Sequence, residues 1–510
     1  MIGIGSARRW RLAGALLSGL LLASSFPPLS LSFVAFVGLI PLFLVLDESR
    51  TSGEAYRAGF FCGVAFFLPL LWWIAVLDSP QLTVPWIRVP AMMAVVLYLS
   101  LFVGLFGVAY SFVRKRTPAA VWLIAPAFWT LWEIARGAGQ LGFPWGELGY
   151  SQVPLLPSLQ MARVTGIHGL TFWIVLVNAL AYEALRSPRP RKWAVFAAAL
   201  LIPIALGAWH LHRDSSRGDP TVRAALVQPS VRNDEKWDPE GRAKIFGLLS
   251  ELTKEGVGQG ANLVIWAETA APCYALKDAE WGPVVQGIAR ESGVPIFLGL
   301  PDYQVSADRR VTYTNTAALF DGSGRFVDRM DKIQLVPFGE HVPYSQKFKI
   351  LEKVDFGEAD FIPGTRYVLF DAAGARFANL VCFEATFPHL TRRYVKKGAD
   401  LLVSITNDSW FGAGSGAEQH AEMAIARCVE TGRSMARCAN SGISLGVDPC
   451  GRRIGETKLF TRTVSVVEVP IRHEITPYVR LGDWISALSG FQATVLAGAA
   501  LLGRRVRKES

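Results

Sequence analysis

The chain has 510 residues and a formal net charge of +10, yet only 18% of its residues are charged. Soluble globular chains usually carry about 25% charged residues, and here the deficit falls in residues 1–212, which form a series of long apolar runs. Residues 213–480 have an ordinary globular mix. Composition therefore argues against a wholly soluble protein. The basic residues cluster at the ends of apolar runs, which is typical of membrane topology and argues against a nucleic-acid partner.

The apolar runs predict eight membrane spans, because about 20 apolar residues cross a bilayer. The spans are expected near residues 11–26, 29–46, 58–77, 91–113, 119–136, 164–185, 193–210 and 484–502. The first two are short and could be mistaken for a signal peptide. The apolar runs that follow, and the lack of a small-residue cleavage site, favour retained helices.

The Lys and Arg clusters predict the orientation of these spans, since such clusters mark cytoplasmic loops. The clusters are Arg8, Arg9 and Arg11; Arg50 and Arg57; Arg114, Lys115 and Arg116; Arg186, Arg189, Arg191 and Lys192; and Arg504, Arg505, Arg507 and Lys508. Alternate loops are poor in Lys and Arg. We therefore expect cytoplasmic termini, seven spans in residues 1–212, an extracytoplasmic domain at 213–480, and one span with a basic tail in 481–510.

Strand and helix patterns alternate through residues 213–480, which predicts a layered α/β domain. Strands are expected at 221–229, 263–266, 294–300, 314–320, 325–332, 376–382 and 401–406, and helices near 239–255, 278–292, 387–398 and 417–431. A DGSG turn at residues 321–324 predicts a hairpin between the fourth and fifth strands.

Three short motifs each place a reactive side chain at the end of an apolar strand pattern. They are WAET at residues 266–269, DKIQLVPFGE at 331–340 and VCFE at 381–384. Ligand sites in open α/β sheets form beyond the carboxyl ends of strands. Glu268, Lys332 and Cys382 are therefore expected to meet although they lie far apart in the chain.

These three side chains suit acyl transfer through a thioester. A thiolate is a strong nucleophile, a carboxylate can remove the thiol proton, and an ammonium group can stabilise an oxyanion. Each residue alone has an ordinary interpretation: Cys382 as a small packing residue, Glu268 as a carboxylate at a helix N-terminus, and Lys332 as a hairpin charge. Their occurrence together, each at a strand end, favours catalysis.

The cysteine pattern gives no sign of a metal or cofactor. Five of the six cysteines lie in residues 213–480, so they cannot all pair with one another and at least one thiol has no partner among them. CxxC pairs and regular Cys/His spacings are absent from the sequence. Cys428 and Cys438 are most simply packed thiols, although a disulfide between them stays open.

The three motifs resemble the Glu–Lys–Cys triad of the nitrilase superfamily. The segment NDSWFG at 407–412, EQH at 418–420 and the arrangement of seven spans before and one after resemble the apolipoprotein N-acyltransferases. The resemblance implies an αββα sandwich with Glu268 as base, Lys332 as oxyanion stabiliser and Cys382 as nucleophile. It also implies supporting carboxylates at Glu340 and Glu384.

The same resemblance implies substrate contacts for three aromatic residues: Trp237, Phe383 and Trp410. Phe383, His341 and Ala417 depart from residues common in the family, which affects the expected substrate contacts and leaves the triad intact. Asn407 and Asp408 are expected to shape a loop, and His420 to be a structural hydrogen-bonding residue.

The implied reaction moves a fatty acyl chain from a phospholipid to the N-terminal amine of a diacylated apolipoprotein, at the bacterial inner membrane, without a cofactor. A membrane-tethered amidase or nitrilase that uses water shares the triad and is the alternative. Eight spans favour substrates that reside in the bilayer, because a hydrolase would need only one anchor. A transporter or scaffold with an inactive domain fits less well, since the triad is intact and paired broken helices are not evident.

Overall fold

A computed structural model describes residues 4–77, 85–214, 218–305, 309–345, 347 and 361–506. The chain divides into two compact units. The first comprises Met1–Val76, Trp86–Asp214 and Arg480–Ser510, and the second comprises Leu77–Pro85 and Ser215–Val479. Part of the expected basic tail, residues 507–510 with Arg507 and Lys508, lies outside the described residues.

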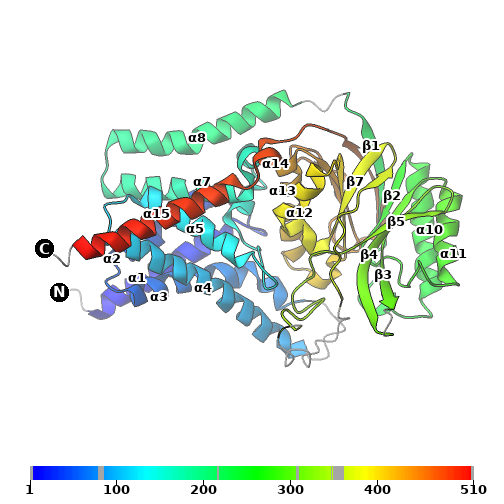
Figure 1. The fold of residues 1–510 in the computed structure, drawn as a ribbon, viewed down its shortest axis with the longest axis horizontal. Coiled ribbons are helices and arrows are strands. Elements are labelled where there is room, and N and C mark those ends of the chain that lie inside the picture. Colours follow the sequence, from blue (N-terminus) through cyan, green and yellow to red (C-terminus); the bar gives the residue numbers. More distant parts are fainter. Residues whose placement is uncertain are drawn as a thin grey trace. The chain divides into compact units, whose positions relative to one another are not determined.

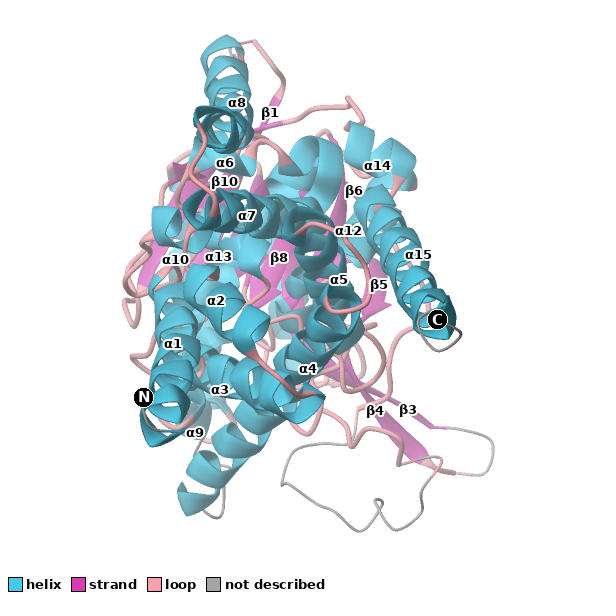
Figure 2. Cartoon of the chain, turned by 90° about the vertical axis from the view of Figure 1, so that its left-hand side faces the viewer, coloured by secondary structure: helices cyan, strands magenta, loops and turns pink. Residues whose placement is uncertain are grey.

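The first unit is helical (Figure 2). Its helices are α1 (Ile4–Ser24), α2 (Ile40–Glu48), α3 (Ser52–Leu70), α4 (Arg88–Arg114), α5 (Val121–Arg136), α6 (Leu156–Leu159), α7 (Ala162–Arg186), α8 (Pro190–Arg213) and α15 (Trp484–Val506). Within the described part of the chain, four helices are long and apolar enough to cross a membrane: α4, α7, α8 and α15.

Helix α3 packs closely against α1 and α4 because glycines remove side-chain bulk from the contacts. A Cβ on Gly59 would lie 2.2 Å from the carbonyl oxygen of Val103 in α4, and a Cβ on Gly19 would lie 2.3 Å from that of Cys62 in α3. Small residues at such positions let helix backbones approach, which is typical of helix packing in membranes.

The expected span at 29–46 is not one continuous helix. It forms a 3-10 turn at Ser32–Phe36 and then α2, whose nine residues extend about 14 Å. Pro41 stands in the first turn of α2, where its missing N–H would have no partner within the helix in any case. Asn178 of α7 bonds the backbone at the break, donating to Ala35 O and accepting from Leu39 N.

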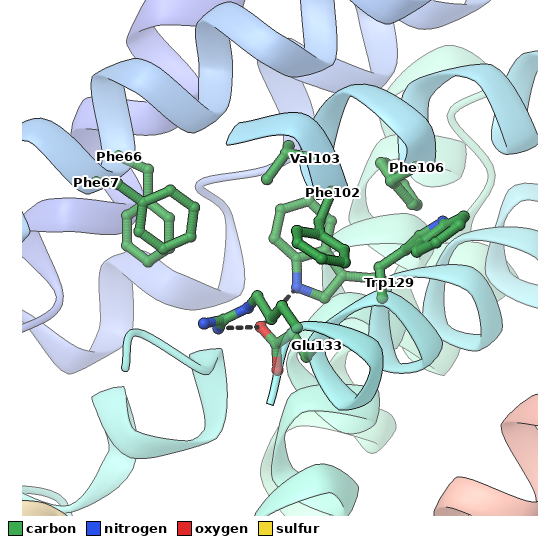
Figure 3. A pocket seen from close by; sticks show the side chains of 9 residues that line it. Phe66, Phe67, Phe102, Val103, Phe106, Trp129 and Glu133 are labelled. Atoms are coloured by element: carbon green, nitrogen blue, oxygen red, sulfur yellow. Dashed lines mark hydrogen bonds and ion pairs between the residues drawn. The ribbon is translucent and has the colours of Figure 1, made fainter. Parts of the chain in front are cut away.

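A small cavity in the first unit is lined mainly by aromatic side chains (Figure 3). Its volume of about 20 Å³ is on the scale of a single water molecule. Buried Glu133 lies beside it and accepts hydrogen bonds from Trp129 Nε1 at 2.9 Å, Thr171 Oγ1 at 2.7 Å and Leu148 N at 3.0 Å. Through these hydrogen bonds the Glu133 carboxylate connects α5, α7 and the loop between them.

The second unit contains two six-stranded sheets. The first has the order β12 (Thr463–Pro470), β1 (Thr221–Gln228), β2 (Leu263–Trp266), β3 (Ile296–Val305), β4 (Val311–Phe320) and β5 (Phe326–Asp331). The second has the order β11 (Arg453–Ile454), β10 (Leu445–Val447), β9 (Ser434–Ala439), β8 (Leu401–Thr406), β7 (Ala375–Val381) and β6 (Phe370–Ala372). Strands β1 to β3 run parallel, as do β7 to β9.

The two sheets pack face to face, with helices on their outer sides (Figure 1). One apolar core lies between the two sheets and includes Leu226 of β1 and Phe377 of β7. A second core lies between the first sheet and helices α10 (Arg242–Gly258) and α11 (Trp281–Ser292). Helices α12 (Pro388–Lys396) and α13 (Gly416–Thr431) cover the second sheet. The expected layered α/β sandwich is confirmed.

Candidate active site

Cys382 begins a short 3-10 helix, Cys382–Thr386, directly after β7, and its backbone is left-handed with φ of +50°. Such a conformation costs a non-glycine residue about 1–3 kcal/mol, so the surroundings must hold it in place. Buried Glu384 supplies part of this support. Its Oε2 accepts from Val381 N at 2.8 Å, and its Oε1 accepts from Ile333 N at 2.6 Å and Gln334 N at 3.2 Å.

Glu384 thus ties the turn at Cys382 to the segment after Lys332. Burial raises the pKa of Glu384 to about 7, while its three backbone N–H donors oppose that shift. Because an ionised carboxylate accepts all three bonds and a protonated one does not, the charge state of Glu384 is coupled to the shape of the turn.

Lys332 follows β5 and is only 1% exposed. Its Nζ lies 2.8 Å from Glu340 Oε1 and 3.3 Å from Glu268 Oε1. Burial opposes the charged form, but the carboxylates of Glu340 and Glu268 outweigh it and raise the pKa of Lys332 well above its ordinary value. Lys332 therefore presents a permanent positive charge. Glu340 is held in turn by Val336 N, which donates to Oε2 at 2.9 Å.

Glu268 follows β2 and is 6% exposed. Its Oε1 also accepts from Asn315 Nδ2 at 2.8 Å, and its Oε2 accepts from Asn407 N at 2.8 Å. Strand β3 approaches closely from one side, since a Cβ on Gly299 would lie 2.7 Å from Glu268 Cα. The carboxylate is therefore fixed by three groups, with little freedom in its backbone.

The Cys382 thiol lies within electrostatic reach of Glu268 and Lys332. Desolvation raises the pKa of the Cys382 thiol well above its ordinary value; the Glu268 carboxylate adds to this rise, and Lys332 opposes it. A thiol in this environment stays protonated at rest. A thiol of this kind needs a nearby base before it can act as a nucleophile.

The three aromatic residues expected at the substrate occupy different environments. Trp237 follows α9 (Asn233–Lys236) and is 43% exposed, and Trp410 is partly exposed in the turn at Asp408–Phe411. Their loops are joined at Asn233 Oδ1, which accepts from Asn407 Nδ2 at 3.0 Å and Ser409 Oγ at 3.2 Å. Phe383 is 4% exposed and packs edge-on against Phe387.

Comparisons with known proteins agree over nearly the full length of the chain. The family description "Apolipoprotein N-acyltransferase N-terminal domain" matches residues 18–180, and "Carbon-nitrogen hydrolase" matches residues 223–474. The apolipoprotein N-acyltransferase of Geobacter metallireducens is 34% identical, covering 97% of this chain and 96% of the relative. The enzyme of that name from Chlorobaculum tepidum is 33% identical, covering 96% of each.

The chain belongs to the apolipoprotein N-acyltransferase family.

It is accordingly an acyltransferase, with a carbon-nitrogen hydrolase region in its second unit. Among solved structures, an amidase from Nesterenkonia sp. is similar, with 24% identity and a TM-score of 0.38, covering 50% of this chain and 92% of that one. Cys428 and Cys438 of this apolipoprotein N-acyltransferase family member are both free thiols, so the disulfide that the sequence left open is not formed.

Two further residues in this family member contact the proposed triad and were not expected from the sequence. Asn315 of β4 donates through Nδ2 to both Glu268 and Glu340, at 2.8 and 3.1 Å. The sequence signal for Asn315 was an amide side chain within a strand pattern that otherwise contains Thr and apolar residues. Buried Lys236 donates through Nζ to Thr269 Oγ1 at 2.8 Å and Glu268 O at 3.3 Å. Burial lowers the pKa of Lys236 to about 8, against the pull of Glu268.

Proposed function

We propose that this protein transfers a fatty acyl chain from a membrane phospholipid to the N-terminal α-amine of the diacylglyceryl-cysteine of apolipoproteins, through a thioester on Cys382. The observation that carries the proposal is the arrangement of buried Glu268 and Lys332 with partly buried Cys382 in a member of this family. The reaction would complete bacterial lipoprotein maturation.

In the first half-reaction, Cys382 Sγ attacks the ester carbonyl of the phospholipid as Glu268 takes the thiol proton. The new C–S bond leaves a tetrahedral oxyanion, which the Lys332 ammonium stabilises. The intermediate collapses with cleavage of the ester C–O bond, and the departing alkoxide takes the proton from Glu268. The products are the Cys382 thioester and a lyso-phospholipid.

In the second half-reaction, the α-amine of the acceptor attacks the thioester carbonyl. Glu268 accepts a proton from the attacking nitrogen, the C–S bond breaks, and Cys382 regains a proton from Glu268. Donor and acceptor both need the same sulfur, so the lyso-lipid must leave before the acceptor reacts, which is a ping-pong mechanism. Glu340 would orient Lys332, and Glu384 would hold the turn at Cys382. Trp237, Phe383 and Trp410 would contact the substrates.

We further propose a multi-pass protein of the bacterial inner membrane with seven spans in residues 1–212, an extracytoplasmic catalytic domain at 213–480, and a last span with a cytoplasmic tail in 481–510. The four long apolar helices and the one-sided placement of the basic clusters support this topology. Both proposed substrates are anchored in a bilayer, so a catalytic domain that belongs to a multi-span membrane protein suits their delivery.

The test supplies the purified full-length protein, in lipid vesicles, with phospholipid and a synthetic diacylated lipopeptide. Mass spectrometry should find a triacylated lipopeptide and a lyso-phospholipid in equal amounts, and Cys382→Ala should form neither. Release of free fatty acid without triacylated product would instead identify a hydrolase that uses water. Product formation that requires both substrates together, with Cys382 never acylated by phospholipid alone, would exclude the thioester.

A further inference from the structure

A buried polar network lies behind Cys382, on the side of α13 and β9. It consists of His420 of α13, Asp408 in the turn after β8, and Arg437 of β9, and all three are buried. His420 Nδ1 lies 2.9 Å from Asp408 Oδ1, and Arg437 Nη2 donates to Asp408 Oδ2 at 2.8 Å. The other ring nitrogen, His420 Nε2, lies 3.0 Å from the backbone carbonyl oxygen of Cys382.

The chemistry of these groups determines which nitrogen donates. A carbonyl oxygen can only accept, so His420 Nε2 carries a hydrogen and donates to Cys382 O in every protonation state that makes this contact. Asp408 also accepts from Thr406 Oγ1 at 2.7 Å, and the Thr406 side chain interacts with the Cys382 thiol. The network therefore reaches the nucleophile at two points, its carbonyl oxygen and its sulfur.

The hydrogen bond from His420 to the Cys382 carbonyl matters because the backbone of Cys382 has an unusual conformation. Its φ of +50° is a conformation that L-residues other than glycine rarely adopt, and it must be maintained by the surroundings. Glu384 holds the backbone on the N-terminal side of Cys382 through Val381 N. On the C-terminal side, the Cys382 carbonyl points at His420, whose ring is oriented by Asp408 and Arg437.

We propose that His420 is a positioning residue for the nucleophile, which donates from Nε2 to the Cys382 carbonyl and so holds the sulfur in line for attack. Asp408 and Arg437 fix the orientation of its ring. This inference rests on the proposed role of Cys382 as the acyl carrier and adds a residue that acts through it, without itself touching substrate.

Two substitutions separate the two ring nitrogens. In His420→Gln the side-chain amide nitrogen reaches the former Nε2 position and can still donate to Cys382 O. In His420→Asn the shorter amide reaches only the Nδ1 position, so it keeps a contact with Asp408 and loses the one with Cys382. Because a displacement of about 1 Å at a reacting atom costs about 10²-fold in rate, we expect His420→Asn to acylate about 10²-fold more slowly and His420→Gln to stay within about 10-fold of the unmodified protein.

The measurement uses two readouts on full-length protein in lipid vesicles. The first is the rate of Cys382 acylation at saturating phospholipid, with KM determined alongside. The second is the rate at which iodoacetamide alkylates the peptide containing Cys382, which reports on the thiol without any phospholipid chemistry. Wild-type protein that alkylates but never acylates would overturn the proposed function alone. The alkylation rates of the two variants would still test the role of His420.

The expected result is that His420→Gln keeps most of the acylation rate, whereas His420→Asn has a reduced kcat and an unchanged KM. Wild-type rates in His420→Asn would overturn the inference, as would equal losses in both variants that follow their loss of thermal stability. If both variants fail to fold, Gly442→Ala tests the same network. A Cβ there would lie 2.4 Å from Asp408 Oδ2 and displace it. A folded Gly442→Ala protein with wild-type acylation and alkylation rates would also overturn the inference.

Discussion

Gly299 controls the position of the proposed base, and replacing it with Ala should impair catalysis. A Cβ at this position would lie 2.6 Å from Thr269 N and 2.7 Å from Glu268 Cα, whereas ordinary van der Waals contact begins near 3.4 Å. Both atoms are backbone, so the WAET loop must retreat by about 0.8 Å to clear the nearer atom, Thr269 N. A 1 Å misplacement costs about 10²-fold in rate, so we expect Gly299→Ala to lower kcat/KM by roughly 40-fold. Overpacking should also cost about 1–3 kcal/mol of stability.

The assay for Gly299→Ala is triacylated lipopeptide formation under kcat/KM conditions, with thermal unfolding measured on the same samples. Gly287→Ala is the matched control, because a Cβ on Gly287 of α11 would meet no atom within 4 Å. The control should keep full activity and lose no stability. Unchanged kcat/KM in folded Gly299→Ala protein would refute the argument that close approach of β3 positions Glu268.

Three further predictions concern the nucleophile, the topology and the pH dependence. Cys382→Ser should lower turnover by on the order of 10⁴-fold or more while the protein stays folded, because a hydroxyl is a far poorer nucleophile; wild-type turnover would remove Cys382 from the mechanism. An impermeant label applied outside intact cells should modify cysteines introduced at exposed positions in residues 230–470 and not a tag at Ser510, and external labelling of Ser510 would disprove the topology. Thioester formation should fall as pH drops through about 7, since Glu384, raised from 4.5 to about 7 by burial, is protonated below that pH and loses acceptors for its backbone N–H partners. The stability contribution has the opposite sign: between pH 4.5 and about 7 the folded state binds more protons at Glu384 than the unfolded state, so this group lowers the free energy of unfolding as pH rises. An acid limb of the pH–rate profile that persists unchanged in Glu384→Gln would assign it to another group.

The local sequence pattern was sufficient to predict much of the secondary structure of the second unit. Strands β2 and β8 lie at the residues expected from their apolar runs, and α13 begins one residue from its expected start. Hydrophobic runs and helical periodicity are properties of neighbouring residues, so they are visible in the chain itself. We expected Glu268 to meet Lys332 because each follows a predicted strand. The two strands, β2 and β5, lie in one sheet, and the two side chains form an ion pair.

Strand β9 shows what local pattern could not reveal. Its sequence, SMARCA, contains Ser434 and Arg437, which suggest a surface segment, yet every residue of the strand is buried. Ser434 donates to Pro470 O, and Arg437 pairs with Asp408, so both polar groups are satisfied by residues that are distant in the sequence. A buried polar side chain is tolerated only when such partners are present, and they exist only in the folded protein.

The residues of the predicted site and the residues that hydrogen-bond to them differ in the same way. Glu268 and Cys382 could be recognised in the sequence because each follows an apolar strand, whereas Lys332 follows the strand FVDRMD, which contains charged residues. Their hydrogen-bond partners, Asn315 and Asn407 for Glu268 and His420 for Cys382, lie 38 to 139 positions away in the chain. The break in the expected span at 29–46 likewise depends on Asn178 of α7. The sequence by itself determined which segments are apolar and which side chains are reactive. Only the tertiary structure decided which distant polar groups complete one another, because hydrogen bonding between buried groups depends on position in space and leaves no periodic trace in the chain.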